Sequence, residues 1–81
     1  MPDIEVALPP LGDDAPNEAR LSFFYFEEGD AVKKDDDFCE MVTDKAVFNV
    51  PAPVSGTLKK ICVEEDETVS VGGLLAIVET P

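Results

Sequence analysis

Apolar and polar residues alternate along most of the chain, in short runs that turn residues separate. Ile4, Val6 and Leu8 alternate with Glu5 and Ala7, which is the period of a strand that buries one face. Similar apolar runs follow, and none has the 3.6-residue spacing of an amphipathic helix. The pattern predicts an all-β fold of roughly eight short strands. We expect these strands at residues 4–8, 21–26, 31–33, 38–43, 46–50, 58–63, 68–71 and 74–79.

The segments between these runs are rich in residues that favour turns. Pro9-Pro10 ends the first run, and residues 11–18 combine Gly, Pro, Asp and Asn, so we expect a surface loop there. Gly29 and Gly56 are expected to serve backbone geometry. The acidic runs 35–37 and 64–67 are expected to be solvated turns, and Pro51-Ala52-Pro53 to interrupt strand pairing.

The chain repeats itself at a constant offset of 37 positions, because residues 21–43 align with residues 58–80 without a gap. The matching apolar pairs are Leu21 with Leu58, Phe24 with Ile61, Phe26 with Val63, Val32 with Val69, Phe38 with Leu75 and Met41 with Val78. Acidic turns recur at the same offset. Two copies of one β-rich unit, related by a pseudo-two-fold axis, would produce this pattern.

The repeat also predicts which aromatic side chains face the core. Phe24 and Phe26 match apolar residues of the second copy, so we expect both in the core. Phe23 instead matches Lys60, and adjacent residues of a strand point to opposite faces. We therefore expect Phe23 and Tyr25 on the outer surface.

Composition limits the possible functions. A chain of 81 residues is expected to form a single domain, residues 1–81, with one modest core. It has no histidine, which excludes imidazole acid–base chemistry and most zinc sites. The net charge of −12 is expected to repel nucleic acid and anionic membranes, and to favour solubility and basic partner surfaces.

The two cysteines and the chain's apolar segments indicate the cellular setting. Cys39 and Cys62 lack metal-ligand spacing and lie within β-patterned runs, so buried reduced thiols are expected, with a disulfide or redox pair as the alternative. No apolar stretch approaches the roughly 20 residues of a membrane span, and no export signal precedes the first strand. We expect a bacterial cytoplasmic or a mitochondrial matrix location.

Lys45 lies between the two copies of the repeat, where the chain must turn back after the last strand of the first copy. A lysine displayed at such a turn can enter the active site of another protein, whereas a lysine flat on a sheet cannot. The alternative is an ordinary solvated turn lysine, comparable with Lys33, Lys34, Lys59 and Lys60.

Three segments resemble the lipoyl domains of 2-oxo acid dehydrogenase complexes. They are residues 28–34 with 38–46, residues 50–56, and residues 69–79, so the resemblance covers nearly the whole chain. Its most specific part is Thr43-Asp44-Lys45-Ala46 at the expected hairpin tip. The resemblance implies a flattened barrel of two four-stranded antiparallel sheets related by a pseudo-two-fold axis, in agreement with the repeat.

The resemblance also implies a cofactor and partners. Lipoate would be joined by an amide to Lys45, after a lipoate ligase or lipoyl transferase deprotonates the amine. The loaded arm would visit a thiamine-dependent 2-oxo acid dehydrogenase, an acyltransferase catalytic domain and dihydrolipoamide dehydrogenase in turn. The chain would be a carrier domain of a dihydrolipoamide acyltransferase and no enzyme by itself, since it lacks an activated nucleophile or a metal set.

The family also suggests which residues partners recognise. Beside Lys45, they are Val42, Thr43, Asp44 and Ala46, and in the preceding loop Leu11, Gly12, Asp13 and Asp14. The chain departs from the family pattern at Val42, where glutamate is usual, at Asp35, where glycine is usual, and in the individual sequence of residues 9–18.

Two other functions stay open on the sequence. A biotin carrier has the same fold, although biotin acceptors usually have methionine on both sides of the lysine, and here the neighbours are Asp44 and Ala46. The third possibility is a β-barrel interaction module whose lysine is never modified.

Overall fold

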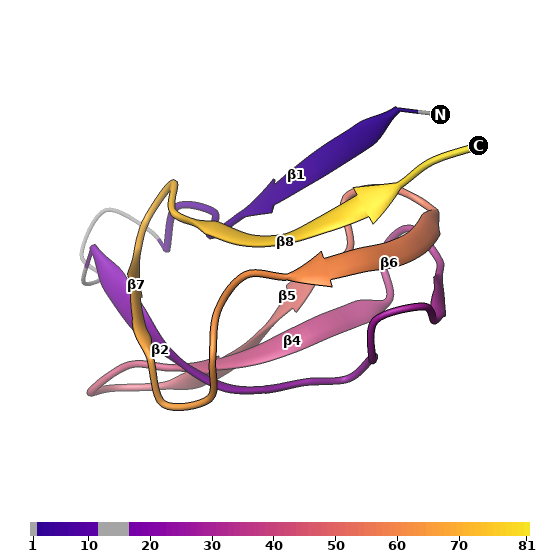
Figure 1. Cartoon of the computed structure of the whole chain (residues 1–81). Helices are drawn as coiled ribbons and strands as arrows, with labels where there is room; N and C mark the ends of the chain where they lie inside the picture. The colour runs from indigo at the N-terminus through magenta and orange to yellow at the C-terminus, as the bar shows by residue number, and fades with distance from the viewer. Residues whose placement is uncertain (1, 12–16) are drawn as a thin grey trace.

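Two four-stranded antiparallel sheets face each other in the computed structural model, which describes residues 2–11 and 17–81 (Figure 1). The strand order is β1-β8-β6-β3 in one sheet and β5-β4-β2-β7 in the other. The expected all-β class and its two sheets are therefore confirmed. The strands are β1 (Asp3–Ala7), β2 (Glu18–Phe24), β3 (Ala31–Val32), β4 (Asp37–Val42), β5 (Val47–Pro51), β6 (Gly56–Ile61), β7 (Thr68–Ser70) and β8 (Leu74–Glu79).

Only β8 has the expected bounds; the other strands differ by one to three residues, and two of these differences are informative. Strand β2 begins at Glu18, which we expected in a surface loop, because Glu18–Arg20 pairs with distant β7. Residues 18–21 do alternate between exposed and buried side chains, but Glu18 follows a run rich in Gly, Pro, Asp and Asn, which favoured a loop. Pro51 was expected to interrupt pairing, but it is the last residue of β5 and lies opposite Asp37. Proline is tolerated there because β5 is an edge strand with only one neighbour.

The strand register confirms the internal repeat. Leu21 pairs with Met41 on β4, and its equivalent Leu58 pairs with Val78 on β8. Both pairings continue through a register shift, at residues 21–23 in the first copy and 58–60 in the second. The irregularity thus recurs at the same offset of 37 positions as the regular pairs.

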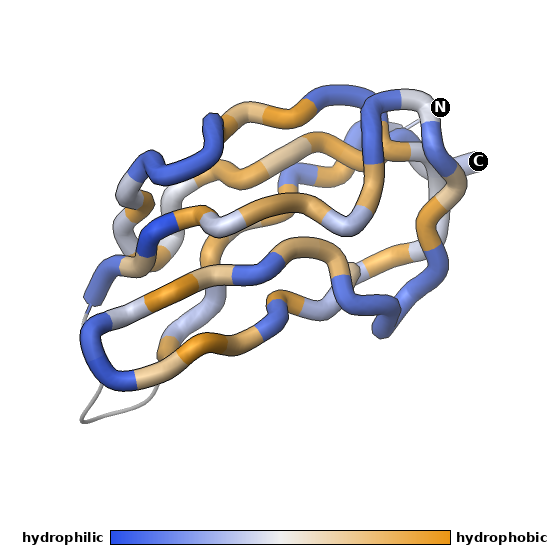
Figure 2. Tube along the Cα trace, turned by 90° about the horizontal axis from the view of Figure 1, so that it is seen from below, coloured by the Kyte–Doolittle hydropathy of each residue, from blue (hydrophilic) through white to orange (hydrophobic). Residues whose placement is uncertain are grey.

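The core lies between the two sheets and consists of their inward-facing apolar side chains. Phe38, Leu8, Leu21, Met41, Leu58, Leu75, Val78 and Cys39 are the largest fully buried side chains. Six of these form three repeat-related pairs on strands β2, β4, β6 and β8: Leu21 with Leu58, Phe38 with Leu75, and Met41 with Val78. Hydrophilic residues gather at the turns, whereas hydrophobic residues line the strands (Figure 2).

Repeat-based facing is confirmed for Phe23 and Tyr25, which are 37% and 43% exposed. Phe24 and Phe26 are only partly buried, packed against the core from its margin. The ring of Phe24 meets that of buried Phe38 edge-on, at a centroid distance of 5.6 Å. The expectation of core positions was therefore too strong for both residues: Phe24 is the last residue of β2 and Phe26 lies beyond it.

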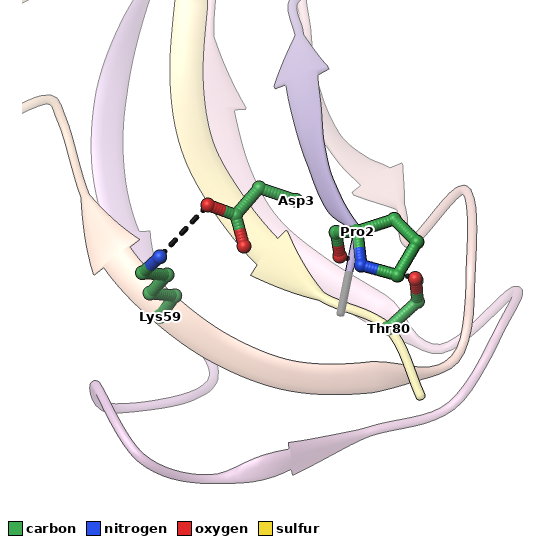
Figure 3. A network of polar contacts seen from close by, with 4 residues as sticks. All are labelled: Pro2, Asp3, Lys59 and Thr80. Carbon is green, nitrogen blue, oxygen red and sulfur yellow. Dashed lines mark hydrogen bonds and ion pairs between the residues drawn. The ribbon is translucent and has the colours of Figure 1, made fainter.

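The two chain ends are held side by side. The backbone N–H and the hydroxyl of Thr80 both donate to the carbonyl oxygen of Pro2, at 2.8 and 3.1 Å. Nearby, the Lys59 ammonium donates to the Asp3 carboxylate at 2.7 Å, across the intervening strand β8 (Figure 3). This hydrogen bond raises the pKa of Lys59. Lys59 and Lys60 lie within β6, so their comparison with turn lysines was wrong.

Both cysteines are free thiols, as expected. Cys39 is buried on β4, and burial raises the pKa of its thiol to about 12. Cys62 follows β6 and is only partly buried, so the expectation of two buried thiols was right for Cys39 alone.

Candidate functional site

Lys45 lies in the four-residue connection between β4 and β5. The last strand pair before the turn joins Val42 and Val47, and residues 43–46 close the hairpin. Lys45 and its neighbours Asp44 and Ala46 are exposed. The hairpin tip is at the end of the molecule opposite the two chain ends (Figure 1). The expected place of the lysine on a turn is therefore what the structure shows.

The side chain of Thr43 organises this turn. Its Oγ1 accepts hydrogen bonds from the backbone N–H groups of Lys45 and Ala46, at 3.3 and 3.1 Å. Its hydroxyl is also 3.3 Å from the carbonyl oxygen of Ala46, to which the Thr43 N–H donates at 2.8 Å. A threonine hydroxyl at the start of a turn commonly satisfies amides two or three residues on. The backbone that carries Lys45 is thereby fixed, while the side chain projects into solvent.

The ammonium group of Lys45 makes no ion pair or hydrogen bond with another described residue. Asp44, next in sequence, does not hold it. An exposed, unpaired amine on a fixed backbone is suited to nucleophilic attack in the active site of another protein, once that protein removes its proton. In the described part of the chain, no cluster of three or more His, Cys, Asp or Glu side chains could hold a metal ion.

A shallow cavity of about 430 Å³ lies beside the hairpin. The base of the hairpin contributes Val42, Thr43 and Asp44, and the opposite wall comes from the start of β2 and from β7. Those residues are Glu18, Ala19, Arg20 and Thr68. Sequence reasoning missed this wall, because residues 11–18 were expected to form a surface loop and the pairing of β2 with β7 joins segments far apart in the sequence.

The structure places the other expected recognition residues as follows. Val42 is half-buried on the outer face of β4, and Thr43 is half-buried at the turn. Leu11 is partly buried and packs against the core, which identifies a structural role for it. Gly12, Asp13 and Asp14 lie outside the described residues.

Comparison with known proteins gives one consistent result. The family model described as "Biotin-requiring enzyme", of the biotin/lipoyl type, matches residues 4–78. The dihydrolipoyllysine-residue acetyltransferase component of the pyruvate dehydrogenase complex from Corynebacterium glutamicum is 39% identical over 80 residues, covering 94% of this chain and 12% of that protein. The protein of the same name from Staphylococcus aureus strain Mu50 is 32% identical over 77 residues, covering 95% of this chain and 18% of that protein.

A solved structure agrees with these relatives. The lipoyl domain of the 2-oxoglutarate dehydrogenase complex from Azotobacter vinelandii matches with a TM-score of 0.72 and 28% identity, over 96% of this chain and 99% of that domain. These similarities favour a lipoyl carrier over a biotin carrier. The chain spans less than a fifth of the length of the acetyltransferases it matches. The described residues contain no helix that is long and apolar enough to cross a membrane.

Proposed function

Because a biotin/lipoyl family model matches residues 4–78, the chain belongs to that family, and we propose that it is a lipoyl carrier domain with lipoate joined to Lys45. The observation that carries this proposal is the hairpin tip itself. Lys45 is exposed, has no ion-pair partner among the described residues and follows Thr43, whose hydroxyl fixes the turn. The lysine is therefore presented on a rigid support without being bound by it.

When attached, lipoate supplies a disulfide that accepts an acyl group together with two electrons. The residues of this chain hold that group rather than transform it. The β4–β5 pairing and Thr43 fix the direction in which the lysine leaves the surface. The lysine side chain, neutralised by amide formation, adds the flexible length that lets one domain reach several active sites.

Biotin is the second candidate, since the family model includes biotin carriers. It is disfavoured because Asp44 and Ala46 flank the lysine, where biotin acceptors usually have methionine on both sides. The relatives and the solved neighbour also carry lipoyl names.

Intact-mass measurement tests the attachment. The chain is co-expressed with a lipoate ligase in medium that contains both lipoate and biotin, and the modified residue is located by peptide mapping. We expect one lipoyl group, on Lys45. The Lys45→Gln variant should stay unmodified with an unchanged circular dichroism spectrum, because an exposed turn residue contributes little to packing. A matched control, Lys34→Gln, alters another exposed turn lysine and should leave modification unchanged.

Lipoate on a different lysine would refute the assignment of Lys45. A biotinyl group would replace the proposed function by the second candidate. A chain that stays bare beside a lipoyl domain modified by the same ligase would leave only the interaction module.

The names of the relatives support a proposal for the partners of this domain. We propose that the domain serves a pyruvate dehydrogenase complex as part of a dihydrolipoamide acetyltransferase, since the matched acetyltransferases have that name. Its partners would be a lipoate ligase or lipoyl transferase, the thiamine-dependent dehydrogenase, the acetyltransferase catalytic domain and dihydrolipoamide dehydrogenase. Acylation of the lipoylated domain should proceed with pyruvate and its dehydrogenase, and not with 2-oxoglutarate and its own.

A further inference from the structure

The outer face of the lysine-bearing sheet carries exposed apolar side chains next to the hairpin. Phe23 on β2, Tyr25 just beyond it and Val47 on β5 are 37%, 43% and 62% exposed. Val42, half-buried, pairs with Val47 at the base of the Lys45 turn. We call these four residues the aromatic face: Phe23, Tyr25, Val42 and Val47.

The aromatic face has a fixed geometry. The rings of Phe23 and Tyr25 meet edge-on, at a centroid distance of 4.8 Å and an interplanar angle of 67°. The Tyr25 hydroxyl donates to Oδ1 of Asn49 at 2.9 Å. Since Asn49 lies on β5, this bond reaches across the intervening strand β4 and holds the ring over the sheet. Aromatic residues held in this way can bind a partner with little loss of conformational entropy.

The internal repeat provides a control for what the fold itself requires. At the positions of the β1-β8-β6-β3 sheet that match Phe23 and Val47, the chain has Lys60 and Asp3. In that sheet Lys59 forms an ion pair with Asp3 across the intervening strand β8. The equivalent positions of the lysine-bearing sheet are Ser22 and Val47. The same fold therefore accepts polar residues at the equivalent sites of the other sheet. Leu74 on β8 is also 36% exposed, but packing within this domain does not account for apolar residues at the sites of Phe23 and Val47.

Charge indicates what covers this face. The chain has a net charge of −12, so a second copy would be repelled. Lys33, Lys34, Lys59 and Lys60 all lie on or directly after strands of the other sheet. Around the aromatic face, the cations are Arg20, which is 3.9 Å from Asp66, and Lys45, whose charge is lost on amide formation. Glu40, half-buried, lies between Phe23 and Asn49 in the same row of the sheet.

We propose that the aromatic face is the docking surface for the dehydrogenase that acylates the arm on Lys45, and that this enzyme presents an apolar contact ringed by cationic side chains. The inference rests on the proposed function, which identifies the dehydrogenase as the partner. The contact residues and the apolar character of the contact are inferred from the aromatic face. Four side chains form a small contact, and small contacts are typical of transient complexes. Transient binding suits a carrier, because the arm must leave for the next active site.

Neutral variants test this without changing charge. Phe23→Thr and Val47→Thr, alone and together, replace apolar area by a residue that suits strands. The matched control is Ile77→Thr, on the outer face of the opposite sheet, where Ile77 is half-buried and occupies the position equivalent to Glu40. Each variant is lipoylated, checked by intact mass and thermal unfolding, and then acylated by the pyruvate dehydrogenase enzyme of the source organism with pyruvate. A parallel measurement gives the rate of lipoylation.

We expect the double variant to lose about tenfold in kcat/KM for acylation, as truncation of interface anchors does, with lipoylation unchanged. Ile77→Thr should acylate like the parent. Equal kcat/KM for the parent and the double variant would overturn the inference and leave the proposed function intact. An equal loss in Ile77→Thr, or a loss of lipoylation in place of acylation, would also overturn it.

Two further outcomes would decide against the inference in a different way. A parent chain that sediments as a dimer, and a Phe23→Thr variant that sediments as a monomer, would assign this face to a second copy. A parent that accepts no lipoate would remove the proposed function, and the inference would fall with it.

Discussion

Asp35 and Gly72 occupy equivalent positions in the two halves of the chain, and both have a positive φ, 73° and 85°. Gly29 and Asp66 form a second equivalent pair, with φ of 98° and 68°. Each half therefore needs two left-handed residues in its turns, and in each pair one is glycine and the other aspartate. Aspartate tolerates this region better than most residues with a Cβ. Asp35, which departs from the usual glycine of the family, keeps the conformation that glycine provides.

The first prediction concerns this pair. Asp35→Gly should raise the free energy of unfolding by up to about 1 kcal/mol, because it relieves the left-handed strain and removes one charge from the run 35–37. Gly72→Ala should lower it by about 1 kcal/mol, although no atom lies within 4 Å of the added Cβ, because only its φ is unfavourable. Urea denaturation measures both. Asp35→Asn is the control that removes the charge alone, and a gain as large as that of Asp35→Gly would show that φ is not the cause.

The second prediction concerns the support of Lys45. Thr43→Val keeps the shape of the side chain but removes the acceptor for the amides of Lys45 and Ala46. It should therefore lower the free energy of opening the turn by about 1 kcal/mol. Amide exchange at residues 45 and 46 should accelerate, and kcat/KM for lipoylation should fall several-fold. Thr43→Ser retains the oxygen and should restore both. If Thr43→Ser behaves like Thr43→Val, the methyl group and not the hydroxyl organises the turn.

The third prediction concerns the two faces of one strand. Phe24→Ala should cost about 2–3 kcal/mol, because Phe24 packs edge-on against buried Phe38 from a half-buried position. Phe23→Ala should cost less than about 1 kcal/mol, since Phe23 is exposed and contacts only the Tyr25 ring among aromatic neighbours in the described residues. Thermal and urea unfolding give both values. Equal losses would contradict the facing that the repeat predicts.

The fourth prediction concerns Cys39, whose pKa burial raises to about 12 from an ordinary value of 9.0. Above pH 9 the unfolded thiol loses its proton while the folded thiol keeps it, so the unfolded state binds fewer protons. This contribution to stability is therefore complete below pH 9 and falls as the pH rises from 9 towards 12. Cys39→Ala should flatten the alkaline decline of the unfolding free energy, relative to the parent, in that range.

Thiol labelling at pH 8 provides an independent measurement of the same burial. Cys62, which is only partly buried, should react in the folded protein, and Cys39 only as fast as the chain unfolds. The Cys62→Ser variant isolates the slow reaction. Rapid labelling of Cys39 in that variant would contradict its burial.

The sequence predicts the local and the repeated parts of this fold well. Apolar runs separated by turn residues located all eight strands, and the bounds of β8 were correct at both ends. The outward facing of Phe23 was predicted correctly because its equivalent in the second copy is the polar Lys60. The predicted start of β2 was wrong, because the turn-rich residues before Glu18 favoured a loop, whereas Glu18–Arg20 pairs with distant β7.

The same distinction applies to the site. Lys45 could be located because its turn lies between two matched strands, which sequence order alone reveals. Thr43 was expected only as a recognition residue, because its bonds to the turn amides depend on geometry that the letters do not show. The outward facing of Phe23 and Tyr25 was predicted, but their grouping with Val47 was not, because it depends on β5 lying two strands from β2 in the sheet.

The hairpin tip and the chain ends are related by the same pseudo-two-fold axis: the pair Val42 and Val47 matches the pair Glu79 and Asp3. Lys45 is consequently at one pole of a body with a long axis of 37 Å, and the clasp between Thr80 and Pro2 is at the other. Any attachment made through the ends acts as a pivot. If the rigid domain rotated about that pivot, Lys45 would move on an arc whose radius is comparable with the long axis, even with its own side chain held still.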